Sequence, residues 1–275
     1  MHTLPTLPNS IVSFIDFANK TFADSGDSSL DSIAEEFKAI DVAMVNGIIN
    51  SEISRILINP FDAPTGWDTN QILLEVNKNF SLGISILHVS PPHLLNSVAN
   101  AVYKVAGKTS FKHVLYKLPE TFQREVFDPE LRPVTARANH LAPGEVLRIR
   151  AGVDLIDWQI QEPVVLLRFI TAPQDAIQWT FRKDPIRPWF VASVDPDATQ
   201  LSGLFSYFEA MSYEPAAIPI TNLLGHRNHQ VRWQATKALW KIDQNLGMQA
   251  LRAALADPHP HVRNAASKTL AKFDD

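Results

Sequence analysis

Apolar residues recur at helical spacing through the first sixty residues of this chain. The first run begins near Ser10, and its apolar positions share one helix face: Ile11, Phe14, Ile15 and Phe22. A second helical run follows, is expected to break at Asn46-Gly47, and ends before Pro60. The pattern predicts a helical N-terminal region over residues 1–70 whose apolar faces pack against the rest of the protein.

From residue 71 the hydrophobic pattern changes to short runs that favour β-strands. Seven of them alternate or are continuously apolar, and Pro, Gly and Asn separate most of them: 80–89, 111–119, 134–138, 145–151, 153–160, 164–170 and 176–181. Because no long helix separates these runs, they favour an antiparallel sandwich or small barrel over a parallel α/β sheet. The sequence therefore predicts a β domain over residues 71–185.

Helical spacing returns in the last third of the chain. The segment 183–200 contains three prolines and is interpreted as a linker. Residues 190–275 follow as a third region, which is predicted to be helical throughout.

This third region contains an internal repeat. Residues 223–243 match residues 254–274 after a shift of 31, and the aligned pairs are Val231/Val262, Arg232/Arg263, Ala235/Ala266 and Leu239/Leu270. A faded third copy is predicted to start at Asp195-Pro196-Asp197. A repeat of this length is a helical hairpin that cannot bury its apolar face alone, so the copies are expected to stack.

The order D-P-x-x-x-V-R-x-x-A-x-x-x-L, clearest from Asp257 onward, resembles the short HEAT-like repeats of phycobilin lyase subunits. The resemblance covers residues 221–273 and, more weakly, 190–220. It implies stacked helical hairpins, and such stacks usually present binding surfaces. In repeats of this kind the arginine, here Arg232 and Arg263, usually bonds to an acidic residue of a neighbouring turn. We expect Asp257 to cap the helix that follows it.

The β region resembles a cupin, a small jelly-roll barrel. His93 and Gly107 have the spacing of the first cupin motif, and Gly144 and Gly152 that of the second. The other three ligand positions of the family hold different residues here: Leu95, Asn100 and Leu155. Leucine offers no donor to a metal, so the resemblance implies a cupin-like barrel that has lost its metal.

Other residues of the β region could form a different metal site. The candidate ligands are His88, His93, His113, His140 and Glu145. On this hypothesis the protein is a metal-dependent cupin-type enzyme, a dioxygenase or isomerase that acts on a small molecule with one transition-metal ion.

Charge is distributed unevenly along the chain. The net charge is −4, which argues against a protein that coats nucleic acid along its whole length. Residues 221–273 nevertheless hold eight Lys and Arg against two Asp, a net charge of +6, whereas residues 1–60 carry −5. The basic segment predicts an acidic partner, either another protein or this protein's own N-terminal region. Two clear repeats are too few to wrap a duplex, so we expect no direct contact with nucleic acid.

Signals for other chemistry are missing from the sequence. There is no cysteine, no GxSxG, no Walker loop and no GxGxxG fingerprint. Asp154 and Asp157 are three apart on a predicted strand and therefore face opposite sides. A cluster of aromatic residues is expected to lie in the core: Trp158, Trp179, Phe181 and Trp189. Without a secretory signal or an apolar span, the expected location is cytoplasmic.

Together these patterns predict an α+β multidomain protein with N-terminal helices, a central antiparallel β-sandwich or cupin-like barrel, and C-terminal HEAT-like repeats. The leading hypothesis is a non-enzymatic interaction or scaffolding protein without catalytic residues or cofactor. Its oligomeric state is left open. By analogy with the repeat family alone, a lyase or chaperone for a cofactor-bearing protein is a further hypothesis. The predicted partner-binding residues are Arg227, His229, Lys237, His259, His261 and Lys268.

Overall fold

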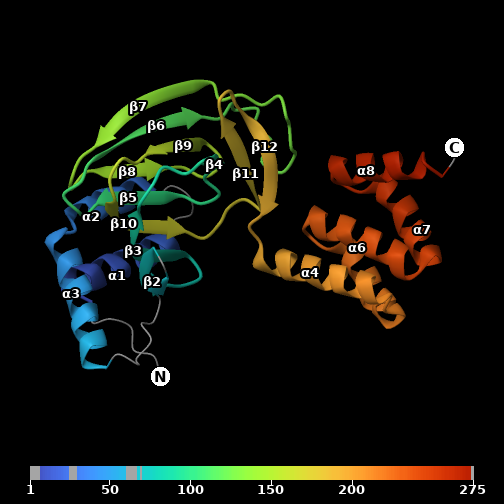
Figure 1. Ribbon diagram of the computed structural model, residues 1–275, viewed down its shortest axis with the longest axis horizontal. Helices are drawn as coiled ribbons and strands as arrows, with labels where there is room; N and C mark the ends of the chain where they lie inside the picture. The colour runs from blue at the N-terminus through green and yellow to red at the C-terminus, as the bar shows by residue number, and fades with distance from the viewer. Residues whose placement is uncertain (1–6, 25–29, 60–66, 69, 274–275) are drawn as a thin grey trace. The chain divides into compact units, whose positions relative to one another are not determined.

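The computed structural model describes residues 7–24, 30–59, 67–68 and 70–273. The chain forms two compact units, one of Met1–Phe122 with Asp128–Phe190 and the other of Gln123–Phe127 with Val191–Asp275. The predicted fold class is confirmed, since helices come first, antiparallel sheets follow and helices end the chain (Figure 1).

Three N-terminal helices belong to the first unit: α1 (Asn9–Asp24), α2 (Leu30–Ala39) and α3 (Ala43–Ile58). The expected interruption at Asn46-Gly47 is wrong, because both residues lie inside α3. The chain breaks instead between α2 and α3, where the Asp41 carboxylate accepts a hydrogen bond from Ala43 N at 2.9 Å. That bond satisfies an N–H that a helix start leaves unpaired, which favours this start over one at Gly47.

The helices cover one face of a six-stranded sheet (Figure 1). Its order is β1 (Trp67–Asp68), β2 (Gln71–Val76), β3 (Phe80–Leu87), β10 (Val164–Thr171), β5 (Ala101–Val105) and β8 (Val146–Ile149). Aromatic rings fill the layer between helices and sheet. The Phe14 ring lies 5.2 Å from Phe37 and 5.6 Å from Phe169, edge-on to the latter, the geometry that aromatic pairs prefer.

A second six-stranded sheet packs on the other face of the first. Its order is β12 (Ile186–Ser193), β11 (Ile177–Lys183), β4 (Leu94–Asn96), β9 (Asp154–Gln159), β6 (Phe111–Lys117) and β7 (Thr135–Leu141). Phe111 and Ile156 of this sheet share a buried core with Leu166 of the first. The first unit thus has three layers, one of helices and two of strands.

Eight of these strands have the order of a jelly roll. If β3 to β10 are counted as strands one to eight, the two sheets read 1-8-3-6 and 2-7-4-5. All seven sequence-predicted strands are present, and two cupin-motif glycines, Gly144 (φ 81°) and Gly152 (φ 64°), occupy left-handed turns before and after β8. Each sheet ends in edge strands, so the pairing of the described strands closes no barrel.

The segment interpreted as a linker is partly a strand, so that interpretation is wrong. Residues 186–193 form β12, an edge strand beside β11. Pro188 fits there because the proline nitrogen, which has no hydrogen to donate, need not serve a second neighbouring strand. Trp189 on this edge is 44% exposed, contrary to its expected core position, and packs on Arg182 at 5.1 Å. Trp179 and Phe181 are fully buried, as predicted.

The second unit is helical. It contains α4 (Pro196–Met211), α5 (Ala217–Asn222), α6 (His229–Ile242), α7 (Gln244–Ala253) and α8 (Pro260–Leu270), with short 3-10 turns between some of them. Asp195 caps α4 by accepting a hydrogen bond from Asp197 N at 3.0 Å, and Pro196 takes the first helical position. No helix among the described residues is long and apolar enough to cross a membrane.

Candidate partner-binding site

The repeated sequence positions form the contact between the helices of the second unit. Val231, Ala235 and Leu239 of α6 are buried, as are Val262 and Ala266 of α8. Gly247 of α7 lies so close to α6 that a Cβ atom there would be 2.3 Å from Trp240 Cα. Small residues thus bring the helices together, as the repeat predicted.

The repeat arginines brace the turns between helices. Arg232 donates to both carboxylate oxygens of Asp257 at 2.7 Å, and its Nη1 donates to the carbonyls of His226 and Arg227 at 2.8 and 3.1 Å. Arg263 repeats the second pattern one unit later, with carbonyl contacts five and six residues before it. The predicted structural role is confirmed for Arg232. The bonds to Arg232 help to hold the pKa of Asp257 below its usual value against the opposing effect of burial.

Asp257 does not cap α8 as expected. His259 is the capping residue, since its Nδ1 accepts a hydrogen bond from His261 N at 3.3 Å. The helix begins at Pro260 because a proline there needs no backbone donor, and Asp257 is left free to pair with Arg232.

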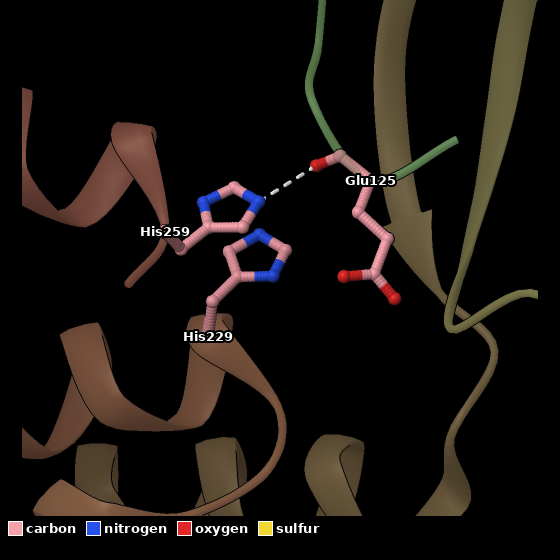
Figure 2. Close-up of side chains that lie close together, drawn as sticks. All are labelled: Glu125, His229 and His259. Carbon is pink, nitrogen blue, oxygen red and sulfur yellow. Dashed lines mark hydrogen bonds between the residues drawn. The ribbon is translucent and has the colours of Figure 1, made fainter. Parts of the chain in front are cut away.

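Three histidines gather at this end of the helices, around residues of the segment Gln123–Phe127, which belongs to the same unit. The rings of His229 and His259 stack face to face, 3.6 Å apart and 5° from parallel (Figure 2). His261 Nε2 accepts a hydrogen bond from Phe127 N at 2.7 Å. We call Glu125, His229, His259 and His261 the histidine cluster.

Hydrogen bonds fix the proton on His259. Its Nδ1 accepts from a backbone N–H, so the neutral ring carries its hydrogen on Nε2 and donates it to the Glu125 carbonyl at 3.1 Å (Figure 2). The ring of His229 makes no hydrogen bond to any other described residue. The cluster therefore already holds the Gln123–Phe127 segment against the helices through two histidines.

The cluster is also the group of described residues best placed to hold a metal ion. The donor atoms of Glu125, His229 and His259 lie within 4.8 Å of one another. A histidine binds a metal through a lone pair in its ring plane, and the planes of two parallel rings do not meet. An ion would therefore require one ring to turn out of the stack and His259 to release the Glu125 carbonyl.

The stacked histidines predict that acid destabilises the helical unit. Burial, followed by the neighbouring His259, lowers the pKa of His229 from 6.5 to about 4, and burial lowers the pKa of His259 as well. Because the unfolded chain binds these protons more readily, the stabilisation is complete above pH 6.5 and is lost as the pH falls toward 4. We expect about 1–3 kcal/mol of stability to be lost over this range.

Thermal unfolding between pH 7.5 and 4 measures this loss. His229→Leu should flatten the dependence, because it removes a buried ring whose pKa is lowered. An identical pH profile in His229→Leu and the unsubstituted protein would contradict the prediction.

A second feature of the same unit is a cavity bordered by α4, α6, α7 and α8. Its volume is about 220 Å³, and Trp233, Trp240 and Leu251 line it. Lys237 and Lys241 of α6 are exposed and also border it. Neither indole N–H finds an acceptor among the described residues. We call this cavity the tryptophan slot.

Four of the six predicted partner-binding residues lie in these two places. His229, His259 and His261 belong to the histidine cluster. Lys237 borders the tryptophan slot, and Lys268 is exposed on α8. Arg227 is exposed and lies 3.4 Å from Asp195. The role of these six residues in binding a partner stays a prediction. The tryptophan slot was not predicted from the sequence, although Trp233 and Trp240 are two helical turns apart and therefore share a face of α6.

The five metal candidates of the β region are spread over the first unit. His88 follows β3, and His93 precedes β4 and contacts Trp189, with the ring centroids 4.7 Å apart and the planes tilted by 59°. His113, His140 and Glu145 line one cavity of about 490 Å³. These three do not form a metal-ligand group in the part of the chain that the structure describes.

The paired aspartates of β9 face opposite sides, as predicted. Asp154 is buried and pairs with Lys117, and Asp157 pairs with Lys183 at 2.6 Å. Each carboxylate therefore has its own cation, which suits a structural role better than joint acid–base work.

The fold and these surfaces define a protein of two parts, a jelly roll and a short array of helical repeats. Residues 218–275 match the family model of HEAT repeats. This match confirms the resemblance of the C-terminal segment and begins within α5. A search of the curated proteins finds no relative of this chain.

Several solved structures are similar to the chain at low levels. Hydroquinone 1,2-dioxygenase PnpCD is 12% identical, with 55% of this chain and 79% of that chain covered and a TM-score of 0.30. Hydroquinone 1,2-dioxygenase from Sphingomonas sp. TTNP3 is 11% identical, with 41% of this chain and 71% of that chain covered and a TM-score of 0.30. DMSP lyase DddQ from Ruegeria pomeroyi DSS-3 is 10% identical, with 37% of this chain covered and a TM-score of 0.25. The match covers 43% of that chain, so this chain spans less than half of that protein. The strand order given above, and not these likenesses, defines the jelly roll.

Proposed function

We propose that the protein is an interaction module whose helical unit binds an acidic protein partner. The observation that carries the proposal is the tryptophan slot on a segment that matches HEAT repeats. Repeats of this class stack into surfaces that contact other proteins, and tryptophan is enriched where binding energy concentrates.

The slot fits an apolar side chain of the partner. Trp233, Trp240 and Leu251 supply apolar walls, and burying a large apolar side chain contributes about 1.5–3 kcal/mol. The two indole N–H groups can donate to carbonyl or carboxylate oxygens of the partner at the same time.

Charge supports an acidic partner. Lys237 and Lys241 border the slot against the single carboxylate of Glu209, within a segment whose net charge is +6. Such complementarity increases association rates and excludes basic partners more than it adds affinity.

Charge reversal at the slot tests the proposal. We expect Lys237→Glu combined with Lys241→Glu to lower the affinity for the partner at least tenfold, about 1.4 kcal/mol, because two attractions become repulsions. The measurement is quantitative capture from the native host, followed by calorimetry with the recovered partner. Lys20→Glu combined with Arg252→Glu gives the same charge change at exposed residues that do not line the slot and should bind normally. Equal capture by the two double variants would refute the role of the slot.

A second candidate function, a metal-dependent enzyme acting on a small molecule, is favoured by one observation. Three of its five predicted ligands, His113, His140 and Glu145, line a single cavity of the jelly roll. Elemental analysis of the purified protein tests it, since a stoichiometric transition metal that disappears in His113→Ala with His140→Ala would support this function.

A further inference from the structure

The cavity of about 490 Å³ in the first unit has the features of a small-molecule site. It lies where β7 and β8, an edge strand of each sheet, meet helix α2. Lys104 of β5 holds this end of α2 in place by donating to the Lys38 carbonyl at 2.6 Å. The volume is within the range of about 300–1,000 Å³ that ligand clefts occupy.

One buried side chain in the cavity lacks a partner. His113 is 2% exposed, and its Nδ1 atom has no hydrogen bond. Burial lowers the pKa of His113, with a smaller effect from His140, so the ring is neutral at neutral pH. Leaving such a polar atom buried and unpaired is unfavourable, and a molecule in the cavity would satisfy Nδ1 once the ring turns this atom, which is closed to solvent, toward it.

The cavity contains two cations that pair with no carboxylate. Arg148 is engaged by Asp31 at 2.7 Å, and Glu145 accepts a hydrogen bond from Ala142 N at 2.7 Å. Arg137 and Lys38 have no ion-pair partner among the described residues, and the carboxylates of Glu35 and Glu145 also line the cavity. Of the two cations, Arg137 is the one whose guanidinium can bind a carboxylate through two parallel hydrogen bonds.

The pairing of β6 with β7 places these groups on one face. His113 is opposite Asn139, and Leu115 is opposite Arg137, so His113 and Arg137 are diagonal neighbours on the same side of the ladder. Such neighbours lie about 7–8 Å apart at the backbone, which lets one small molecule reach both side chains.

We propose that this cavity binds a small carboxylate that carries a hydroxyl group. The carboxylate pairs with the fork of Arg137, and the hydroxyl group bonds to His113 Nδ1. A hydroxyl group both donates and accepts, so it satisfies this nitrogen in either tautomer of the neutral ring. The inference is independent of the partner-binding function of the helical unit and requires no metal.

Calorimetry of the full chain in buffer containing EDTA tests this inference with two matched pairs of acids, lactate against propionate and malate against succinate. Within at least one pair we expect the hydroxy acid to bind at least fivefold more tightly. His113→Leu should abolish that preference, and His113→Gln, which restores polar atoms, should recover part of it. Arg137→Gln, at an exposed position, should lower the affinity for both acids of the pair about tenfold.

Arg132→Gln is the matched control, because Arg132 is exposed and does not line the cavity. Thermal unfolding of each variant establishes that it is folded. Equal affinity for hydroxy and plain acids, a preference that survives in His113→Leu, or no binding of any of the four acids would each overturn the inference.

Discussion

Replacing Arg232 by leucine is expected to lower the free energy of unfolding of the helical unit by about 3–5 kcal/mol. The Arg232 and Asp257 side chains are only 11% and 8% exposed, so the substitution leaves a carboxylate buried without its cation. It also removes the donor to the His226 and Arg227 carbonyls. Truncating one member of a buried pair costs more than the pair itself contributes, because the remaining charge cannot return to water.

Arg263→Leu is the matched control for this substitution. Arg263 occupies the same repeat position but donates only to backbone carbonyls near the surface. We therefore expect its replacement to lower the free energy of unfolding by only about 1 kcal/mol. Urea titration with hydrogen exchange of α6 and α8 measures the helical unit separately from the jelly roll. A similar loss of unfolding free energy in the two variants would mean that the buried ion pair between Arg232 and Asp257 adds no stability beyond the backbone hydrogen bonds.

Gly247→Ala is expected to have the second-largest effect, a loss of about 2–3 kcal/mol in the same assay. The added Cβ atom would lie 2.3 Å from Trp240 Cα and 2.6 Å from Trp240 N. Backbone atoms cannot turn aside as a side chain can, so α6 and α7 must separate. Because Gly247 and Trp240 both line the tryptophan slot, partner binding should weaken together with stability.

Gly203→Ala provides the contrast. Gly203 lies within α4, and a Cβ atom there meets nothing within 4 Å. Alanine in a helix interior is favoured over glycine by about 0.5–1 kcal/mol, so this variant should be more stable than the unsubstituted chain. If both alanine variants are destabilised, the close approach of α6 and α7 is not the cause.

Local patterns predicted the elements of this protein well. Seven strands and the buried positions of the last two repeats follow from alternation and spacing, which depend on residues that are close in sequence. The prediction at β12 is wrong because Pro188 marks a break in most settings but is tolerated on an edge strand. The predicted α8 cap is wrong because two prolines flank His259 and either fits a helix start.

The candidate sites were harder to predict, because they depend on contacts between distant residues. His259 and the Glu125 carbonyl are 134 residues apart, and no periodicity links them. His113 was singled out as a possible ligand, but its unpaired nitrogen and its neighbour Arg137 emerge only from the pairing of β6 with β7. The sequence does contain a signal for the tryptophan slot, since two tryptophans lie seven residues apart on one helix. The predicted binding residues were instead chosen from the pattern of charges.

The helical unit is not one continuous stretch of chain, since the segment Gln123–Phe127 belongs to it. An excised fragment that begins at Val191 would lack the peptide groups that bond to His259 and His261. A synthetic peptide spanning that segment should therefore bind to such a fragment and raise its melting temperature, as in fragment complementation. Insertions between β6 and β7 should likewise alter the repeats, although they fall far from them in the gene.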